Sequence, residues 1–306
     1  MPTSRPLKKP PGPWMIVWKK FFRNPFAMTG LIVLLIFMAG SFLAPVITPF
    51  KPNNIDLMIS NLPPGTDNHV LGTDELGRDI FSRLLYGGQI SLIVGFTVAA
   101  ASVIIGSLIG AVSGYFGGWI DTIFMRLVDV MNSIPLLFLN ILVLAIFGSE
   151  VRYMIMILAF TSWMGIARLV RGTFLQLRET QYVEAAKAIG VSSGGIIFRH
   201  LLRNASFPII VNATLMVGGA ILSESALSYL GLGIQAPDTS WGQMLSNAQE
   251  FMLTDPIQAV YPGLCIFIVV LAVNFIGDGI RDALDPRQKA MLSQRRLKQW
   301  RKDYSK

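Results

Sequence analysis

Few side chains in this sequence could carry out chemistry, and they lie far apart. Within the 306 residues there is 1 cysteine, Cys265, inside an apolar run, and there are 2 histidines, so neither a disulfide framework nor an imidazole metal cluster is expected. Asp121 and Asp129 could form the carboxylate pair of an aspartyl enzyme, but their spacing on one expected helix separates them by about 12 Å, too far to share a proton. No lysine follows a glycine, so the Gly-Lys-Ser/Thr turn that holds ATP phosphates is missing. We therefore expect no enzyme activity, no metal and no cofactor in this chain.

Charged residues in stretches that are otherwise apolar include Arg126, Asp129 and Glu224. An ionisable group in lipid is costly, so such a group is usually functional or paired. Arg126 and Asp129 are three residues apart on an expected helix, and we predict that they pair with each other on a surface that faces protein.

Glu224 lies between Ser223 and Ser225 and admits two interpretations. It could line a path or relay protons, as intramembrane carboxylates often do. It could instead bond to serines and backbone amides in an unwound, water-accessible hairpin near the outer face. The second interpretation is favoured because Gly218 and Gly219 weaken the helix just before it.

The composition indicates that lipid is the main solvent of the chain. Hydrophobic residues make up 52% of the sequence and charged residues 14%, whereas soluble domains have roughly 25% charged residues. A helix needs about 20 apolar residues to cross a bilayer, so we predict an all-α polytopic membrane protein with six transmembrane helices. The predicted spans are residues 27 to 48, 89 to 114, 122 to 147, 153 to 171, 205 to 231 and 258 to 280.

Outside the first span and the five-helix core (89 to 280) lie three segments: a basic amphipathic segment (1 to 26), an extracytoplasmic segment (49 to 88) and a basic tail (281 to 306). Trp14, Val17, Trp18 and Phe21 have helical spacing, which predicts an interfacial helix against membrane lipid. The net charge of +8 does not indicate a nucleic-acid partner, because the basic residues do not gather on a folded soluble face.

Lysine and arginine predict the orientation. The N-terminal segment has 6 of them, the loop from 172 to 204 has 4 and the tail after Ile280 has 9, against 3 between 49 and 88. By the positive-inside rule, both termini and this loop are cytoplasmic.

Three local features are predicted along the spans. Residues 73 to 86 read as an outer surface helix, capped by Thr73, with Asp74–Arg78 and Asp79–Arg83 pairs, and ended by the glycines at 87 and 88. The glycines at 106, 110, 114 and 118 allow a neighbouring backbone to approach closely. A proline at 135 is expected to kink the third span.

The long cytoplasmic loop contains a short helix with small side chains. Thr180 can cap it, and Gly190 suits the left-handed residue that ends it. One apolar stripe is predicted from Tyr182, Ala185, Ala186 and Ile189. A helix of this shape fits the groove of another protein, although alanine-rich surface helices are common.

The loop resembles the EAA signature of permease subunits from binding-protein-dependent ABC importers. It matches at Glu184, Ala185, Ala186, Gly190 and Leu202, and it departs at His200, where the pattern has Ile, and at Arg203, where it has Pro. Four longer stretches (71 to 92, 114 to 135, 223 to 245 and 274 to 286) are similar to the dipeptide, oligopeptide and nickel permease group, and in particular to subunits of the DppC or OppC type. His is common at the Ile position of that group, so Arg203 is the departure that remains, and it concerns the turn after the docking helix.

The resemblance implies a type I ABC importer transmembrane domain in the cytoplasmic membrane of a bacterium or archaeon. The five-helix core (89 to 280) would form half of a path for peptides or a related small solute, and nickel is among the solutes that the resemblance implies. Glu184 would meet a basic residue of an ATPase. The implied partners are a second homologous permease subunit in a heterodimer, two ATP-binding subunits that hold ATP and Mg²⁺, and an extracytoplasmic solute-binding protein.

An ion-gradient-driven secondary transporter is the alternative function. Such a transporter usually has two related halves with paired broken helices, and no such halves are evident by eye. The sequence does not predict the solute, because selectivity in importers of this type rests largely with the binding protein.

Overall fold

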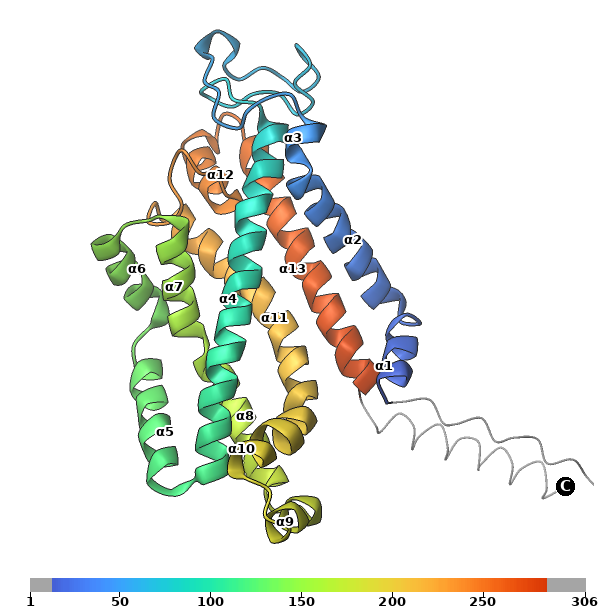
Figure 1. Ribbon diagram of the computed structural model, residues 1–306. Coiled ribbons are helices and arrows are strands. Elements are labelled where there is room, and N and C mark those ends of the chain that lie inside the picture. Colours follow the sequence, from blue (N-terminus) through green and yellow to red (C-terminus); the bar gives the residue numbers. More distant parts are fainter. Residues whose placement is uncertain (1–12, 285–306) are drawn as a thin grey trace, which may run out of the picture.

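The computed structural model of the chain describes residues 13 to 284. Within these limits the protein consists of helices and loops, with isolated β-bridges in the outer segment and no strand (Figure 1). Part of the basic N-terminal segment (1 to 12) and most of the predicted tail (285 to 306) lie outside the described residues.

Five helical stretches in the described part are long and apolar enough to cross a membrane: Pro25–Phe42, Ile80–Phe116, Val151–Leu177, Ser193–Tyr229 and Ile257–Leu284. The pair Gly118–Ser133 and Leu136–Phe147, bent by 85°, makes a sixth candidate span when its two helices are counted together. The first, second and sixth spans are α2 (Pro25–Phe42), α4 (Ile80–Phe116) and α13 (Ile257–Leu284). The broken third span is α5 (Gly118–Ser133) with α6 (Leu136–Phe147), the fourth is α7 (Val151–Ser162) with α8 (Met164–Leu177), and most of the fifth is α11 (Leu202–Tyr229).

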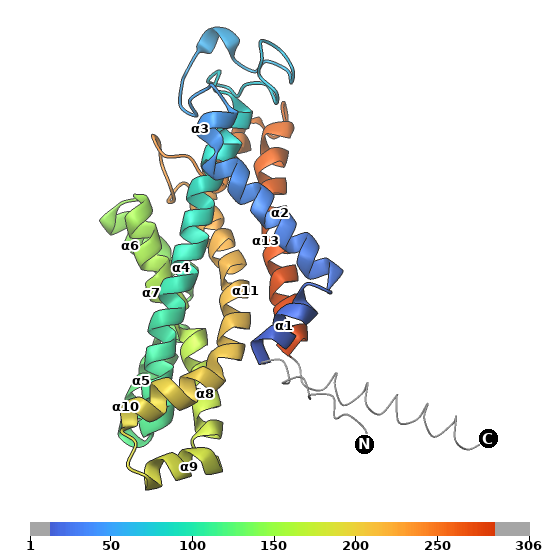
Figure 2. The ribbon, with the colours of Figure 1, turned by 45° about the vertical axis from the view of Figure 1, so that its right-hand side comes forward.

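The central helix of the fold is α4, which contacts α2, α7, α8 and α11 (Figures 1 and 2). Its 37 residues give a length of about 55 Å, well beyond the roughly 30 Å of a hydrocarbon core. The glycine stripe predicted from the sequence packs α4 against α8. A Cβ on Gly106 would lie 2.5 Å from the carbonyl oxygen of Trp163. A Cβ on Gly110 would overlap the carbonyl oxygen of Ala167. Gly118 differs, because it has a φ of +55° and begins α5.

The first span packs on the last one. A Cβ on Gly30 of α2 would lie 2.5 Å from the carbonyl oxygen of Ala272 in α13. The predicted amphipathic helix is present as α1 (Pro13–Phe21), and its Phe21 is buried against Ala27 and Ala283. Phe21 therefore packs on protein, whereas Trp18 is exposed.

The third span is broken more sharply than a kink. Ile134 is extended (ψ 128°) and Pro135 follows it, between the two helices. The proline ring disfavours a helical conformation at the residue before it and has no N–H to donate. The chain therefore leaves α5 and starts α6 in a new direction.

The outer helix differs from the prediction. Helix α4 begins at Ile80, not near Thr73, because the Asp74 and Asp79 carboxylates bond to backbone amides of their own turns. Asp79 is the N-cap and accepts from the Ser82 amide at 2.7 Å. The glycines at 87 and 88 do not end the helix but let it approach Ser240, Trp241 and Ser41 closely.

A short helix, α12 (Trp241–Ala248), packs between the outer ends of α4, α11 and α13. Trp241 is buried there, and its indole N–H donates to the Leu84 carbonyl at 2.9 Å. The outer segment from 48 to 79 forms a loop-rich cap above these helix ends, and the loop with α9 (Gln181–Ala188) lies at the opposite end of the molecule (Figure 1).

Candidate functional site

The loop helix α9 ends as its sequence predicts. Gly190 has a φ of +82°, its amide donates to Lys187 and the Val191 amide donates to Ala186, both at 3.0 Å. These bonds satisfy the last carbonyls of the helix, and the left-handed residue costs glycine little. Thr180 precedes the helix, but its hydroxyl donates back to the Leu177 carbonyl and caps nothing.

Helix α9 has one buried and one exposed face. Val183 and Ala186 are buried in a cluster with Phe174 and Leu201, which belong to the segments on either side of the loop. The predicted apolar stripe is therefore wrong in one member, since Ala186 faces the chain's own core. Its other members, Tyr182, Ala185 and Ile189, are exposed, and Ile189 is 81% exposed.

Glu184 is also exposed on α9. Leu202, at the start of α11, is half-buried against the cluster that holds Val183 and Ala186. No turn follows at Arg203, because the helical run is continuous from 193 to 229 through a π-helical turn at Ile196–Leu201. The prediction that Arg203 affects a turn after the docking helix is therefore wrong, because Arg203 is an exposed residue of a helix.

Two ion pairs join α5 to α8, and sequence reasoning missed both partners on α8. Asp121 accepts from Arg171 Nε at 2.5 Å and from Nη2 at 2.6 Å. Asp129 accepts from Arg168 at 2.7 Å, so its partner is not Arg126 as predicted. The sequence signal that could have found these pairs is that two acids of the third span are matched by two arginines near the end of the fourth span.

Glu224 lies inside the unbroken helix α11 and is completely buried. The hydroxyls of Ser228, Ser91 and Ser225 donate to its carboxylate at 2.8, 3.1 and 3.4 Å. The predicted serine partners are confirmed, but the unwound, water-accessible hairpin is wrong, since glycines at 218 and 219 are accommodated within the helix.

Two of the serines that hold Glu224 are themselves fixed by the segment that follows α11. Ser91 accepts from the Trp241 amide and Ser228 from the Ile234 amide, both at 3.2 Å. A hydroxyl has one proton, so each of these serines is oriented to donate it to Glu224. The carboxylate therefore connects α4 and α11 to the segment that carries α12.

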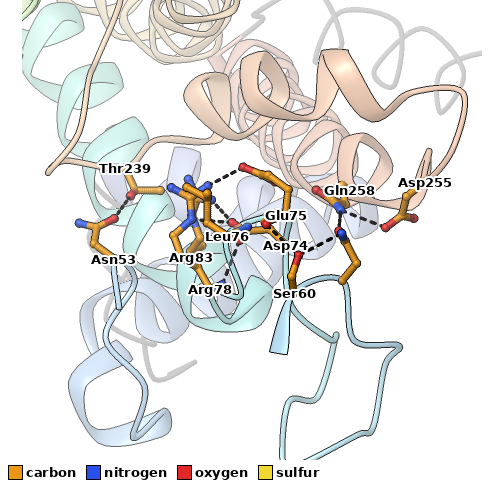
Figure 3. A network of polar contacts seen from close by, with 11 residues as sticks. Asn53, Ser60, Asp74, Glu75, Leu76, Arg78, Arg83, Thr239, Asp255 and Gln258 are labelled. Atoms are coloured by element: carbon orange, nitrogen blue, oxygen red, sulfur yellow. Dashed lines mark hydrogen bonds and ion pairs between the residues drawn. The ribbon is translucent and has the colours of Figure 1, made fainter. Parts of the chain in front are cut away.

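A second polar cluster anchors the outer cap (Figure 3). Asp74 accepts from Arg78 Nε at 2.7 Å and also from Arg83, and Arg78 in turn donates to Glu75 at 2.8 Å. The predicted Asp74–Arg78 pair is confirmed, but the Asp79–Arg83 pair is wrong: Asp79 bonds to His69 at 2.8 Å. Burial raises the pKa of the Glu75 carboxyl, and the neighbouring Asp74 charge raises it further.

The cap also bonds to the loops around α12 and α13. Asn53 accepts from the Thr239 hydroxyl at 3.2 Å (Figure 3). Asn61 accepts from Gln258 at 3.2 Å. Side chains from three distant parts of the sequence thus hold the cap over the outer helix ends.

Comparison with known families gives two matches that together cover most of the chain. Residues 102–290 match the family described as binding-protein-dependent transport system inner membrane component. Residues 12–64 match the N-terminal TM domain of oligopeptide transport permease C.

Curated relatives are similar over nearly their full length. The chain is 40% identical to the dipeptide transport system permease protein DppC of Alkalihalophilus pseudofirmus, over 94% of this chain and 97% of the relative. It is also 40% identical to the oligopeptide transport system permease protein OppC of Haemophilus influenzae, over 90% and 89%. Identity to the glutathione transport system permease protein GsiD of Pectobacterium atrosepticum is 40%, over 91% and 92%.

A solved structure shares the fold. The inward facing MetNI methionine ABC transporter contains a chain that matches with a TM-score of 0.53 and 20% identity, over 66% of this chain and 96% of that chain.

Proposed function

Because this chain belongs to the family of binding-protein-dependent transport system inner membrane components, we propose that it is a permease subunit of an ATP-driven importer. It forms half of a path for peptides or a related small solute. The names of its relatives, which refer to dipeptides, oligopeptides and glutathione, support the peptide class. Nickel is a second solute class, suggested only by the resemblance of the sequence.

The observation that carries the coupling role is the two-sided helix α9. Val183 and Ala186 fix it to the cluster formed with Phe174 of α8 and Leu201 before α11. Burial of a valine side chain contributes about 1.5 to 3 kcal/mol, so α9 moves together with its spans. The opposite face, with Glu184 and Ile189, is free for a separate ATPase subunit.

Three kinds of partner complete the importer. Two ATP-binding subunits hold ATP and Mg²⁺ on the cytoplasmic side, and Glu184 meets a basic residue of one of them. A second, homologous permease subunit forms the other half of the path, and an extracytoplasmic solute-binding protein delivers the solute to the cap side. Both termini then lie in the cytoplasm of a bacterium or archaeon.

The test is Glu184→Lys in the assembled complex, with Gln181→Lys as a control on a neighbouring exposed position of α9. We expect Glu184→Lys to lose the coupling between ATP hydrolysis and solute uptake while the chain inserts normally, because a repelled basic partner cannot dock. Wild-type uptake by this variant would remove the docking role.

A second measurement separates this proposal from the secondary-transporter alternative. Uptake into vesicles is measured after ATP is depleted and an ion gradient is applied, and the purified complex is examined for an ATPase. Uptake that persists without ATP, in a chain that copurifies with no ATPase, would favour the alternative.

A further inference from the structure

The exposed face of α8 has the wrong chemistry for contact with lipid. Along its 14 residues, the exposed positions are Gly165, Arg168 and Gln176. A Cβ added at Gly165 or at the half-buried Gly172 would meet no atom within 4 Å, so open space lies beside both glycines. No large apolar side chain covers this face, although α8 belongs to a membrane-spanning stretch.

The first span gives the contrast within the same chain. The exposed side chains of α2 include Phe26 at 66%, Leu35 at 53% and Ile36 at 62%. Apolar side chains of this kind are what acyl chains solvate at no cost. The exposed face of α8, which lacks such side chains, therefore indicates surroundings other than acyl chains.

Helix α5 has two exposed stripes side by side. Thr122, Arg126, Asp129 and Ser133 are all exposed and recur at intervals of four, three and four residues, so they share one face. Exposed apolar residues, among them Ile123, Leu127 and Val130, form the adjacent stripe. The helix thus presents one face to an apolar surrounding and one to a polar surrounding.

The polar faces of the two helices meet at the Asp129–Arg168 ion pair. We use "polar seam" for Thr122, Arg126, Asp129 and Ser133 of α5 together with Gly165, Arg168, Gly172 and Gln176 of α8. The two charged side chains of the pair are 54% and 49% exposed. Asp129 lies about 12 Å along α5 from Asp121, which bonds near the inner end of α4 through Ser113. An exposed pair at this depth has no place in hydrocarbon.

We propose that the polar seam lines the water-filled path of the solute, and that Arg168 and Asp129 contact the carboxylate and the ammonium group of a zwitterionic solute such as a peptide. This inference rests on the proposed function. A guanidinium binds a carboxylate through two parallel hydrogen bonds, and an aspartate accepts from an ammonium group. The glycines of α8 leave room beside these charges for a hydrated solute. Burial of the seam against a second permease would require desolvation of both charges of the ion pair, which is unfavourable.

The first experiment measures water access in the assembled complex. Single cysteines replace Thr122 and Gly172 in the seam, and Ile36 and Ile123 on apolar stripes, in a Cys265→Ala background. A charged methanethiosulfonate reagent is applied to the complex in nanodiscs, where both membrane faces are reachable. We expect the seam cysteines to react at least about tenfold faster than the apolar controls, because the reagent cannot enter hydrocarbon.

Two outcomes would overturn the water-filled path. One is that the seam cysteines react as slowly as the control at Ile36. The other is that they react in the isolated chain but are protected in the complex, which would assign the seam to the contact with the second permease. Neither outcome depends on transport, so a failure here is distinct from a failure of the proposed importer function.

The second experiment tests solute contact with dialanine as the probe. We expect Arg168→Gln to raise the KM for dialanine uptake more than that for dialanine amide, because only dialanine has a terminal carboxylate. The exchange of charges, Asp129→Arg with Arg168→Asp, keeps an ion pair but reverses its direction. Wild-type uptake by the exchanged variant, or an equal effect of Arg168→Gln on both probes, would show that the pair acts only in the fold and overturn the contact.

Discussion

At the scale of single residues, Glu224 depends on hydroxyl protons that point toward it. We predict that Glu224→Gln lowers the free energy of unfolding by about 1 to 3 kcal/mol, because the amide nitrogen is no acceptor for the serine that faces it. Uptake should fall by less than about tenfold, since the side chain connects helices and moves no proton. Thermal unfolding and uptake of the purified complex measure the two effects.

A second variant distinguishes the loss of one serine bond from the loss of the Glu224 carboxylate. Ser225→Ala removes the longest of the three bonds, at 3.4 Å, and we expect it to cost less stability than Glu224→Gln. Complete loss of uptake by a normally assembled Glu224→Gln complex would instead assign Glu224 to the transport chemistry.

Glu75 makes the stability of the outer cap depend on pH. Its pKa is raised above the ordinary 4.5 by burial, and then by Asp74. The protonated carboxyl therefore stabilises the fold; this contribution is fully present below pH 4.5 and is lost as the pH rises through the raised pKa. We predict that the stability of Glu75→Gln relative to the wild type increases over that interval, because glutamine does not titrate. Thermal unfolding of both proteins between about pH 4 and 8 measures this, and a constant difference would contradict it.

At the scale of elements, α4 and α8 approach each other through glycine. We predict that Gly110→Ala destabilises the protein by about 1 to 3 kcal/mol, since the added Cβ overlaps the Ala167 carbonyl of α8. Gly219→Ala is the control, because a Cβ at that helical position meets nothing within 4 Å. We expect this change to leave stability equal or raise it by about 0.5 to 1 kcal/mol. The midpoint of thermal unfolding in detergent compares the two.

The two faces of α9 should respond differently to the same change. Ile189→Asp, on the exposed face, is expected to weaken binding of the ATPase subunit while thermal stability stays at the wild-type level. Val183→Asp, on the buried face, is expected to destabilise the loop itself, because an unpaired carboxylate would enter an apolar cluster. Copurification with the ATPase and thermal unfolding distinguish the two effects. Equal losses of stability in both variants would contradict the two-sided helix.

At the scale of the whole molecule, the cap and α9 lie at opposite ends, which predicts how they face the membrane. In a Cys265→Ala background, cysteine at Met58, which is 92% exposed in the cap, should react with an impermeant reagent added outside intact cells. Cysteine at Ile189 should react only after the cells are opened. Reaction of both from the same side would contradict the predicted orientation.

The family, the all-α fold and the six spans could all be predicted from the sequence. Long apolar stretches and the Gly190 helix end are local signals, and each is confirmed. The break before Pro135 was also locally encoded, although its 85° angle was not. Within the described residues one bent helix pair is found, whereas the alternative of a secondary transporter predicts a pair of such breaks.

The choice of polar partners could not be predicted, because it depends on helices that meet in space. Arg126 is near Asp129 in sequence, yet Arg168 from the next span provides the ion pair. The start of α4 was missed for a related reason. The carboxylate of Asp74 bonds to nearby amides and to Arg83, which stabilises a turn where helical spacing alone suggested a helix.

The pairing of α2 with α13 has a consequence for how the protein is made. Helix α2 is synthesised well before α13, so Gly30 lies in the bilayer without this contact until the residues around Ala272 have been synthesised. During this interval α2 can pack on α4 but not on α13, and its apolar side chains suit it to contact with lipid. A nascent chain that stops before α13 would leave the face of α2 around Gly30 in contact with lipid instead of protein.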